Sequence, residues 1–231
     1  MVGSDTMTTL ERAPTTLPGP WHAVCFDLDG LLVDTEPIWM DAKEVLFERY
    51  GVAFDIADHV AVFGTSEVQA AEYFTRRMGL PESEVERIRV EYLELVTVML
   101  MTSDIPIQPG ALELIARLRG RVPIALATNT RRPLADMVLE RTGLAGSFDA
   151  VATSDETNPK PAPDLYLLAC SRLGVRPADA VGLEDSPTGV RAVKAAGLHC
   201  IAVPSAPDSD VSLADEIIGS LWELLDSGVA R

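Results

Sequence analysis

Apolar and polar positions alternate between two periodicities in the second half of the chain. Four segments with helical spacing each precede a short apolar run typical of a buried strand. The predicted helices cover Ala111–Arg119, a segment that begins at Pro133, Pro163–Leu173 and Pro187–Ala196. The predicted strands cover Val122–Thr128, Ala150–Thr153, Ala180–Leu183 and Cys200–Val203, and a further apolar run, His22–Leu28, lies near the N-terminus. Repeated units of this length predict an α/β fold with a doubly wound parallel sheet.

The region between the first strand and the first of these units has a different pattern. From Pro37 to about Ser103 the apolar positions repeat at helical spacing and no strand is predicted. Pro106, Pro109 and Gly110 then end the helical pattern. We therefore expect a Rossmann-like core from residues 21–36 and 108–231, an inserted all-helical cap domain over 37–107, and a flexible N-terminal tail over 1–20. The segment Leu213–Leu225 is predicted to form a final amphipathic helix.

Composition restricts the partners of the protein. The chain of 231 residues has a formal net charge of -16, which argues against nucleic acid and against an acidic membrane surface. A small phosphorylated ligand stays compatible, because a bound cation and a few basic groups can reverse the local field. Cys25 and Cys200 lie in apolar runs and are expected to be small buried groups in a reducing compartment. We expect a cytoplasmic protein that is a monomer or a weak homodimer.

Two aspartates follow the first predicted strand. Asp27 and Asp29 are two residues apart, so along an extended chain their side chains point the same way. Carboxylates this close repel each other unless a cation or a shared proton lies between them. Mg²⁺ prefers oxygen ligands and can bring a phosphate oxygen close to a carboxylate. The pair therefore indicates a magnesium site.

Further chemistry-bearing residues follow the other predicted strands. Glu184 and Asp185 end a later strand and would reach the same edge of the sheet. Thr128 and Asn129 lie where a strand gives way to a helix, a junction that suits an anion, although capping of that helix by Asn129 or Thr130 explains these residues equally well. Lys160 lies in a proline-rich loop and could pair with both Asp27 and a phosphate, or be a solvated surface lysine.

Together these segments resemble the haloacid dehalogenase-like hydrolase superfamily, in particular its phosphatases with a helical cap inserted after the first strand. The resemblance spans His22 to about Val203. Its four motifs match Asp27-Leu28-Asp29-Gly30, Thr128-Asn129, Lys160 and Glu184-Asp185, in the family's order.

The resemblance implies a two-step hydrolysis. Asp27 would attack phosphorus and form an aspartyl phosphate, and Asp29 would act as general acid and then as general base. Thr128, Asn129 and Lys160 would bind the transferring phosphate. Mg²⁺ would be held by Asp27, the backbone carbonyl of Asp29, Asp185 and, directly or through water, Glu184. The cap would close over the core about linkers near Glu36 and Ile107.

The segment Asp34–Trp39 resembles family members that hydrolyse sugar or sugar-alcohol phosphates. A β-phosphoglucomutase-like phosphosugar mutase is the alternative, disfavoured because such mutases carry a histidine where this chain has Trp39. Packing between cap helices explains Trp39 at least as well as contact with a substrate. An alternative of another class is a non-catalytic protein that binds a phosphorylated ligand, disfavoured because every position needed for turnover is filled.

Overall fold

The computed structural model describes residues 21–205 and 209–226, so the predicted tail over 1–20 lies outside the described residues. Its centre is a six-stranded parallel sheet in the order β3-β2-β1-β4-β5-β6. The strands are β1 (Ala23–Phe26), β2 (Ile124–Thr128), β3 (Ala150–Thr153), β4 (Ala180–Glu184), β5 (His199–Ala202) and β6 (Glu216–Ile217). The predicted α/β fold with a doubly wound parallel sheet is confirmed.

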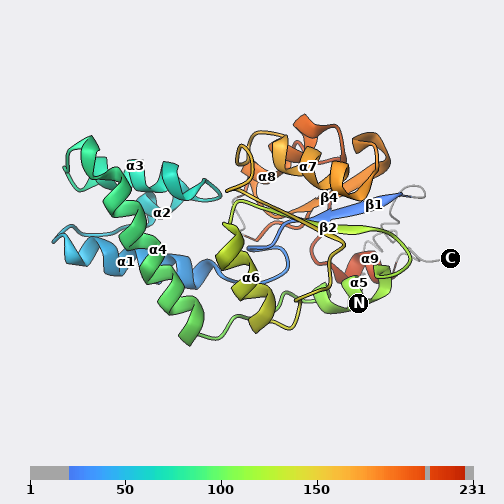
Figure 1. Ribbon diagram of the computed structural model, residues 1–231, viewed down its shortest axis with the longest axis horizontal. Helices are drawn as coiled ribbons and strands as arrows, with labels where there is room; N and C mark the ends of the chain where they lie inside the picture. The colour runs from blue at the N-terminus through green and yellow to red at the C-terminus, as the bar shows by residue number, and fades with distance from the viewer. Residues whose placement is uncertain (1–20, 206–208, 227–231) are drawn as a thin grey trace, which may run out of the picture.

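Helices cover both faces of this sheet (Figure 1). On one face lie α7 (Asp164–Leu173) and α8 (Pro187–Ala196), and on the other lie α5 (Ala111–Leu118), α6 (Arg132–Arg141) and α9 (Trp222–Asp226). The short 3-10 turn η2 (Pro177–Asp179) leads into β4. Along β1, Val24 and Phe26 belong to one buried cluster while Ala23 and Cys25 belong to the other. This alternation follows from the two-residue period of a strand and explains why the run is apolar throughout.

The chain between β1 and α5 is helical, as the sequence predicts. It forms α1 (Glu36–Arg49), α2 (Ile56–Val62), α3 (Glu67–Arg77), η1 (Glu82–Glu84) and α4 (Val85–Thr102), which lie beside the sheet as a separate group in Figure 1. We call residues 36–102 the helical insertion. Its core is aromatic: the Phe74 ring packs edge-on against Phe47 and Tyr92. Over the described residues, no helix combines the length and the apolar character needed to span a bilayer.

The two segments that join the insertion to the sheet are hydrogen-bonded to each other. Asp34 N–H donates to the Pro106 carbonyl (2.8 Å) and Gln108 N–H donates to the Leu32 carbonyl (2.9 Å). Val33 and Ile107 form an antiparallel bridge between these bonds. The insertion is therefore attached through a paired double connection rather than through two independent linkers.

The prediction of a helix over Leu213–Leu225 is wrong. Asp215 N–H donates to the Cys200 carbonyl and Ile218 N–H to the Ala202 carbonyl, so this segment extends the sheet as β6. The helix that follows is the short α9. Leu213 and Ile217, two apolar residues of this segment, are exposed. Pairing with the free edge of β5 outweighs the helical pattern of this segment.

We predict that Glu156→Gln destabilises the loop that carries Lys160. Glu156 accepts from Arg172 (2.6 Å) and from Thr153 N–H (3.0 Å), and these bonds, that of Arg172 first, lower the pKa of Glu156 from 4.5 to about 2. Folding lowers the pKa of Glu156, so its ionised carboxylate stabilises the folded state fully above pH 4.5. This stabilisation is lost as the pH drops toward about 2.

Urea denaturation between pH 3 and pH 7 measures this effect. At pH 7 the free energy of unfolding should fall by about 1 kcal/mol in Glu156→Gln, and the difference from the unaltered protein should shrink as the pH is lowered. Glu140→Gln, an exposed glutamate of α6, is the matched control. A difference that grows toward low pH would contradict the prediction.

Candidate active site

The carboxyl ends of the parallel strands meet at a cavity between the sheet and the helical insertion. Asp27 follows β1, Thr128 ends β2, and Asp185 follows β4. Lys160 reaches the same cavity from the loop between β3 and α7. Residues far apart in the sequence therefore meet where parallel sheets bind ligands. The cavity lining comprises Asp27, Asp29, Glu36, Trp39, Lys43, Val62, Phe63, Gly64, Thr65, Glu67, Ala70, Tyr92, Thr128, Asn129, Thr130, Lys160, Asp185 and Ser186.

Lys160 lies between two carboxylates at the floor of the cavity. Its Nζ is 2.5 Å from Asp27 Oδ1 and 2.6 Å from Glu184 Oε1, and the lysine is 3% exposed. Burial disfavours this ammonium, but the charges of Asp27 and Glu184 outweigh burial and raise the pKa of Lys160 above its ordinary value. The alternative of a solvated surface lysine is therefore wrong.

Asp27, Glu184 and Asp185 form an acidic cluster in which one carboxylate oxygen of each lies within 4.8 Å of the others. Burial raises the pKa of Asp27 to about 7, where the charge of Lys160 opposes the rise and that of Glu184 adds to it. Burial also raises the pKa of Asp185, and Asp27 adds to this effect. Burial is the main cause of both shifts, and the neighbouring carboxylates add to it because a single ammonium faces three of them. The cluster is thus short of positive charge.

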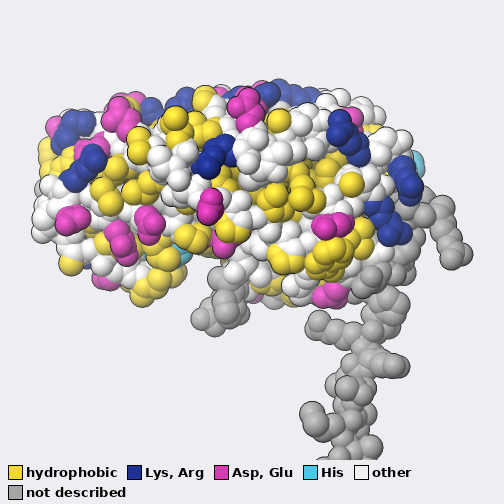
Figure 2. Space-filling model, turned by 90° about the horizontal axis from the view of Figure 1, so that it is seen from below, with side chains coloured by type: hydrophobic (Ala, Val, Ile, Leu, Met, Phe, Trp, Pro, Cys, Tyr) yellow, Lys and Arg dark blue, Asp and Glu magenta, His cyan; other side chains and the backbone are white. Residues whose placement is uncertain are grey.

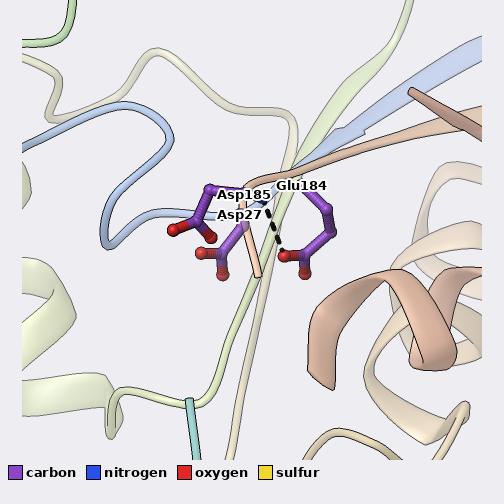
Figure 3. A group of neighbouring side chains, drawn as sticks. All are labelled: Asp27, Glu184 and Asp185. Carbon is purple, nitrogen blue, oxygen red and sulfur yellow. Dashed lines mark hydrogen bonds between the residues drawn. The ribbon is translucent and has the colours of Figure 1, made fainter. Parts of the chain in front are cut away.

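The three carboxylates do not point the same way. Figure 3 shows the carboxylates of Asp27 and Asp185 on one side and that of Glu184 turned to the other. Asp27 and Asp185 line the cavity, whereas Glu184 is fully buried behind them. Glu184 accepts from Lys160, from the Tyr166 hydroxyl (2.6 Å) and from Asp185 N–H (3.2 Å). It therefore fixes Lys160 from behind the cavity.

Two glycines allow the acidic residues to approach the backbone. A Cβ on Gly189, in the first turn of α8, would lie 1.9 Å from the carboxylate of Glu184. A Cβ on Gly30 would lie 2.1 Å from Asp185 Oδ2, and Gly30 also has a φ of +86°. Both positions require the absence of a side chain.

Asp29 lies outside the acidic cluster, and four side chains hold its carboxylate. Oδ1 accepts from the Thr35 hydroxyl (2.5 Å) and the Trp39 indole N–H (3.4 Å). Oδ2 accepts from the Thr130 hydroxyl (2.7 Å) and the Thr128 hydroxyl (3.3 Å). The donors come from both sides of the cavity, so Asp29 is oriented jointly by the sheet and by the segment that begins the helical insertion.

The prediction that Trp39 packs between helices of the insertion is confirmed. Besides its bond to Asp29, its ring packs against Tyr92, with ring centroids 5.9 Å apart. Tyr92 belongs to α4, so Trp39 connects the core of the insertion to the cavity.

Asn129 joins three segments. Its amide nitrogen donates to the Gly64 carbonyl of the insertion (3.1 Å) and to the Lys160 carbonyl (3.3 Å), and its amide oxygen accepts from Lys160 N–H (2.8 Å). The alternative explanation by helix capping is wrong, because the N-cap of α6 is Arg131 and the first N–H of the helix, that of Arg132, donates to Asp155 Oδ1 (2.9 Å).

Two residues of the site, Tyr166 and Ser205, were not identified from the sequence. Tyr166, on the buried face of α7, reaches Glu184 only through packing of that helix on the sheet. Ser205, whose hydroxyl donates to Asp185 Oδ2 (2.6 Å), follows β5. The rule that ligand-binding residues follow parallel strands could have identified Ser205.

Comparison with known proteins agrees with this geometry. A family model described as haloacid dehalogenase-like hydrolase matches residues 21–197. The chain belongs to this family. The fructose-1-phosphate phosphatase YqaB of Escherichia coli is 32% identical over 184 residues, which cover 79% of this chain and 96% of that protein. Relatives of this kind identify the chain as a phosphatase of the haloacid dehalogenase-like hydrolases.

Two further matches cover different shares of the matched proteins. The bifunctional riboflavin kinase/FMN phosphatase of Arabidopsis thaliana is 35% identical over 206 residues, and the match spans 87% of this chain but only 54% of that protein. The crystal structure of CbbY from Rhodobacter sphaeroides in complex with phosphate superposes with a TM-score of 0.78 at 30% identity, covering 88% of this chain and 96% of CbbY. The fold of this chain therefore matches that of CbbY over nearly the whole length of CbbY.

We predict that Tyr166→Phe weakens catalysis by this hydrolase through Glu184. The variant removes one donor from a fully buried carboxylate and leaves Lys160 and the Asp185 N–H to hold it, so kcat/KM for an aryl phosphate should fall about tenfold. Tyr73→Phe is the matched control, because it removes a hydroxyl that donates to Asp58 (2.8 Å) in the helical insertion. Steady-state kinetics and thermal melts of both variants test this, and an equal loss of activity in both would contradict it.

Proposed function

We propose that this phosphatase hydrolyses monophosphate esters of small sugars or sugar alcohols through an aspartyl phosphate on Asp27. The observation that carries the proposal is the position of Asp27. Its carboxylate faces the cavity, one oxygen is held by Lys160, and Asp185 lies beside it. A carboxylate in this position is oriented for in-line attack on a phosphorus atom in the cavity.

The acidic cluster fits Mg²⁺. Its donors are hard carboxylate oxygens within 4.8 Å of one another, and three negative groups share the charge of one lysine. We propose that Asp27 and Asp185, which face the cavity, hold the ion together with the backbone carbonyl of Asp29. Glu184 contributes to binding of the ion through a water molecule or by holding Lys160. When bound, the ion neutralises charge on the phosphate oxygens.

Asp27 then forms a bond to phosphorus while the bond from phosphorus to the ester oxygen breaks. Asp29 gives a proton to the leaving alkoxide, and in the second step it takes a proton from the water that attacks the aspartyl phosphate. Its four hydrogen bonds orient it for both transfers. Hydrolysis returns Asp27 to a carboxylate and releases inorganic phosphate.

Lys160, Thr128 and Asn129 bind the transferring phosphate in this proposal. The charge of Lys160 balances the negative charge that moves from Asp27 to the phosphate oxygens. The Asn129 side chain holds the backbone of Lys160 through two hydrogen bonds. Thr128, the last residue of β2, donates its hydroxyl to Asp29.

The substrate class rests on the relatives and on the cavity. One relative is a fructose-1-phosphate phosphatase, and the cavity is lined on the side of the insertion by both polar and aromatic groups, such as Glu36, Lys43 and Trp39. Such a lining suits a polyhydroxylated leaving group.

We predict that Asp27→Asn abolishes turnover. Release of phosphate from p-nitrophenyl phosphate and from fructose 1-phosphate, measured with Mg²⁺, should fall at least a thousandfold because the amide is a poor nucleophile. Asp136→Asn, on the exposed side of α6 and paired with Arg132, is the control. Undiminished activity of a folded Asp27→Asn protein would refute the proposal.

Assays of the unaltered protein with phosphorylated sugars separate the two alternative functions. A phosphosugar mutase would interconvert glucose phosphates and depend on a bisphosphate activator, and a non-catalytic binding protein would release no phosphate from any ester. Trp39, bound to Asp29 where those mutases carry a histidine, disfavours the mutase.

We predict that Mg²⁺ stabilises the folded protein through Asp185. Addition of MgCl₂ should raise the melting temperature of the unaltered protein by several degrees, because an ion that binds only the folded state shifts the equilibrium toward it. Asp185→Asn should lose this rise, and without Mg²⁺ it should be at least as stable as the unaltered protein because it removes a buried like charge. An unchanged response to Mg²⁺ in Asp185→Asn would count against this metal site.

A further inference from the structure

A second group of charged side chains lies in the cavity wall that the helical insertion contributes. Lys43 of α1 is 4% exposed, and its Nζ is 3.2 Å from His59 Nδ1 of α2 and 3.6 Å from Glu36 Oε1. Lys43 and Glu36 line the cavity, whereas His59 lies behind them. None of these residues takes part in the bond-making and bond-breaking steps proposed above.

The protonation of this group follows from its geometry. His59 Nδ1 lies 3.2 Å from Lys43 Nζ and 3.4 Å from Glu36 Oε1. An ammonium only donates hydrogen bonds, so in the contact with Lys43 Nδ1 accepts and the imidazole is neutral. Burial lowers the pKa of His59, and the charge of Lys43 acts in the same direction. His59 therefore orients Lys43 without adding charge.

Lys43 is incompletely satisfied for a buried lysine. Among the described residues, Lys43 Nζ has one hydrogen-bond acceptor, His59 Nδ1, and a longer ion pair with Glu36 Oε1 at 3.6 Å. Burial lowers the pKa of Lys43, and the charge of Glu36 opposes this effect. Lys160, in contrast, has carboxylate oxygens at 2.5 and 2.6 Å, and Glu67 on the same wall has Arg89 and Arg131 at 3.2 and 3.3 Å. An ammonium has three N–H donors and Lys43 lines the cavity, so donors of Lys43 that His59 does not use are available to a ligand there.

The neighbouring Glu36 selects the kind of ligand. A hydroxyl group can accept from Lys43 and at the same time donate to Glu36, so neighbouring hydroxyls can bridge the two. A second phosphate or a carboxylate would instead lie against Glu36, in a site already crowded with negative charge. Burial raises the pKa of Glu36, and the charge of Asp29 adds to this effect.

We infer that Lys43 and Glu36 bind hydroxyl groups of the leaving alcohol, and that His59 is the positioning residue of Lys43. The protein accordingly prefers monophosphates of polyhydroxy compounds over bisphosphates. This inference rests on the proposed function, because it assigns the part of the substrate that is not transferred.

A pair of esters with the same three-carbon chain tests the inference. Glycerol 3-phosphate carries two hydroxyls that propyl phosphate lacks, and kcat/KM is measured for both in the presence of Mg²⁺. The unaltered protein should favour glycerol 3-phosphate at least tenfold. In Lys43→Met this ratio should fall about tenfold, chiefly through KM, because the hydroxyls lose their partner.

Lys194→Met is the matched control. Lys194 is a lysine of α8 paired with Asp215 at the surface, and its replacement should leave the ratio unchanged. If Lys43→Met does not fold, Glu36→Leu removes the other hydroxyl partner and should lower the ratio in the same way. An unaltered ratio in a folded Lys43→Met or Glu36→Leu protein would overturn the inference.

Other outcomes are equally decisive. If the unaltered protein prefers fructose 1,6-bisphosphate over fructose 1-phosphate and Lys43→Met loses that preference, Lys43 binds an anion and the assignment to hydroxyls is wrong. If the unaltered protein hydrolyses none of these esters and Asp27→Asn changes nothing, the proposed function fails. Hydrolysis of both three-carbon esters with a ratio insensitive to Lys43 overturns the inference alone.

The role of His59 has its own test. His59→Leu removes the acceptor for Lys43 and should lower the ratio for the two three-carbon esters, whereas His59→Asn keeps an acceptor near the position of Nδ1 and should restore most of it. Equal ratios in the two variants would show that His59 does not position Lys43.

Discussion

The site depends on one ammonium group placed among three buried carboxylates. Lys160 contacts Asp27 and Glu184 directly, and Asp185 completes the cluster. Without Lys160, the carboxylates at the ends of β1 and β4 would face each other with no ion-pair partner among the described residues. Accordingly, two sets of hydrogen bonds hold the loop that carries Lys160. The Asn129 side chain accepts from Lys160 N–H, and Glu156 accepts from Thr153 N–H and from Arg172.

A second set of interactions joins the helical insertion to the sheet around the same cavity. Thr35 and Trp39 bind Asp29, Asn129 binds the Gly64 carbonyl, and Arg131 pairs with Glu67. The orientation of Asp29 therefore depends on the position of the insertion. Movement of the insertion away from the sheet would break the bonds to Asp29 as it opened the cavity, which couples access of a substrate to the geometry of the proposed general acid.

The sequence predicts the sheet and the residues at its carboxyl edge because both follow from local patterns. Buried parallel strands are short apolar runs, and the residues that follow them converge whatever the remaining packing, which is why Asp27, Asp185 and Lys160 could be named in advance. Tyr166 and the pair of Lys43 and His59 could not be found this way, because their contacts arise from how helices pack. The C-terminal segment was mispredicted since its strand exists only through pairing with β5.

The charge of the whole chain and the charge of its cavity follow different rules. Figure 2 shows acidic and basic side chains intermixed over one face of the molecule, and a net charge of -16 repels an anion at long range. Within a few ångströms, however, burial makes individual groups dominate. Lys160 lies at the floor of the cavity and Lys43 in the wall of the insertion. Lys160 contacts the proposed nucleophile Asp27, whereas Lys43 lies beside Glu36, which disfavours a second anion. We therefore assign the phosphate to the floor and the uncharged hydroxyls to the wall.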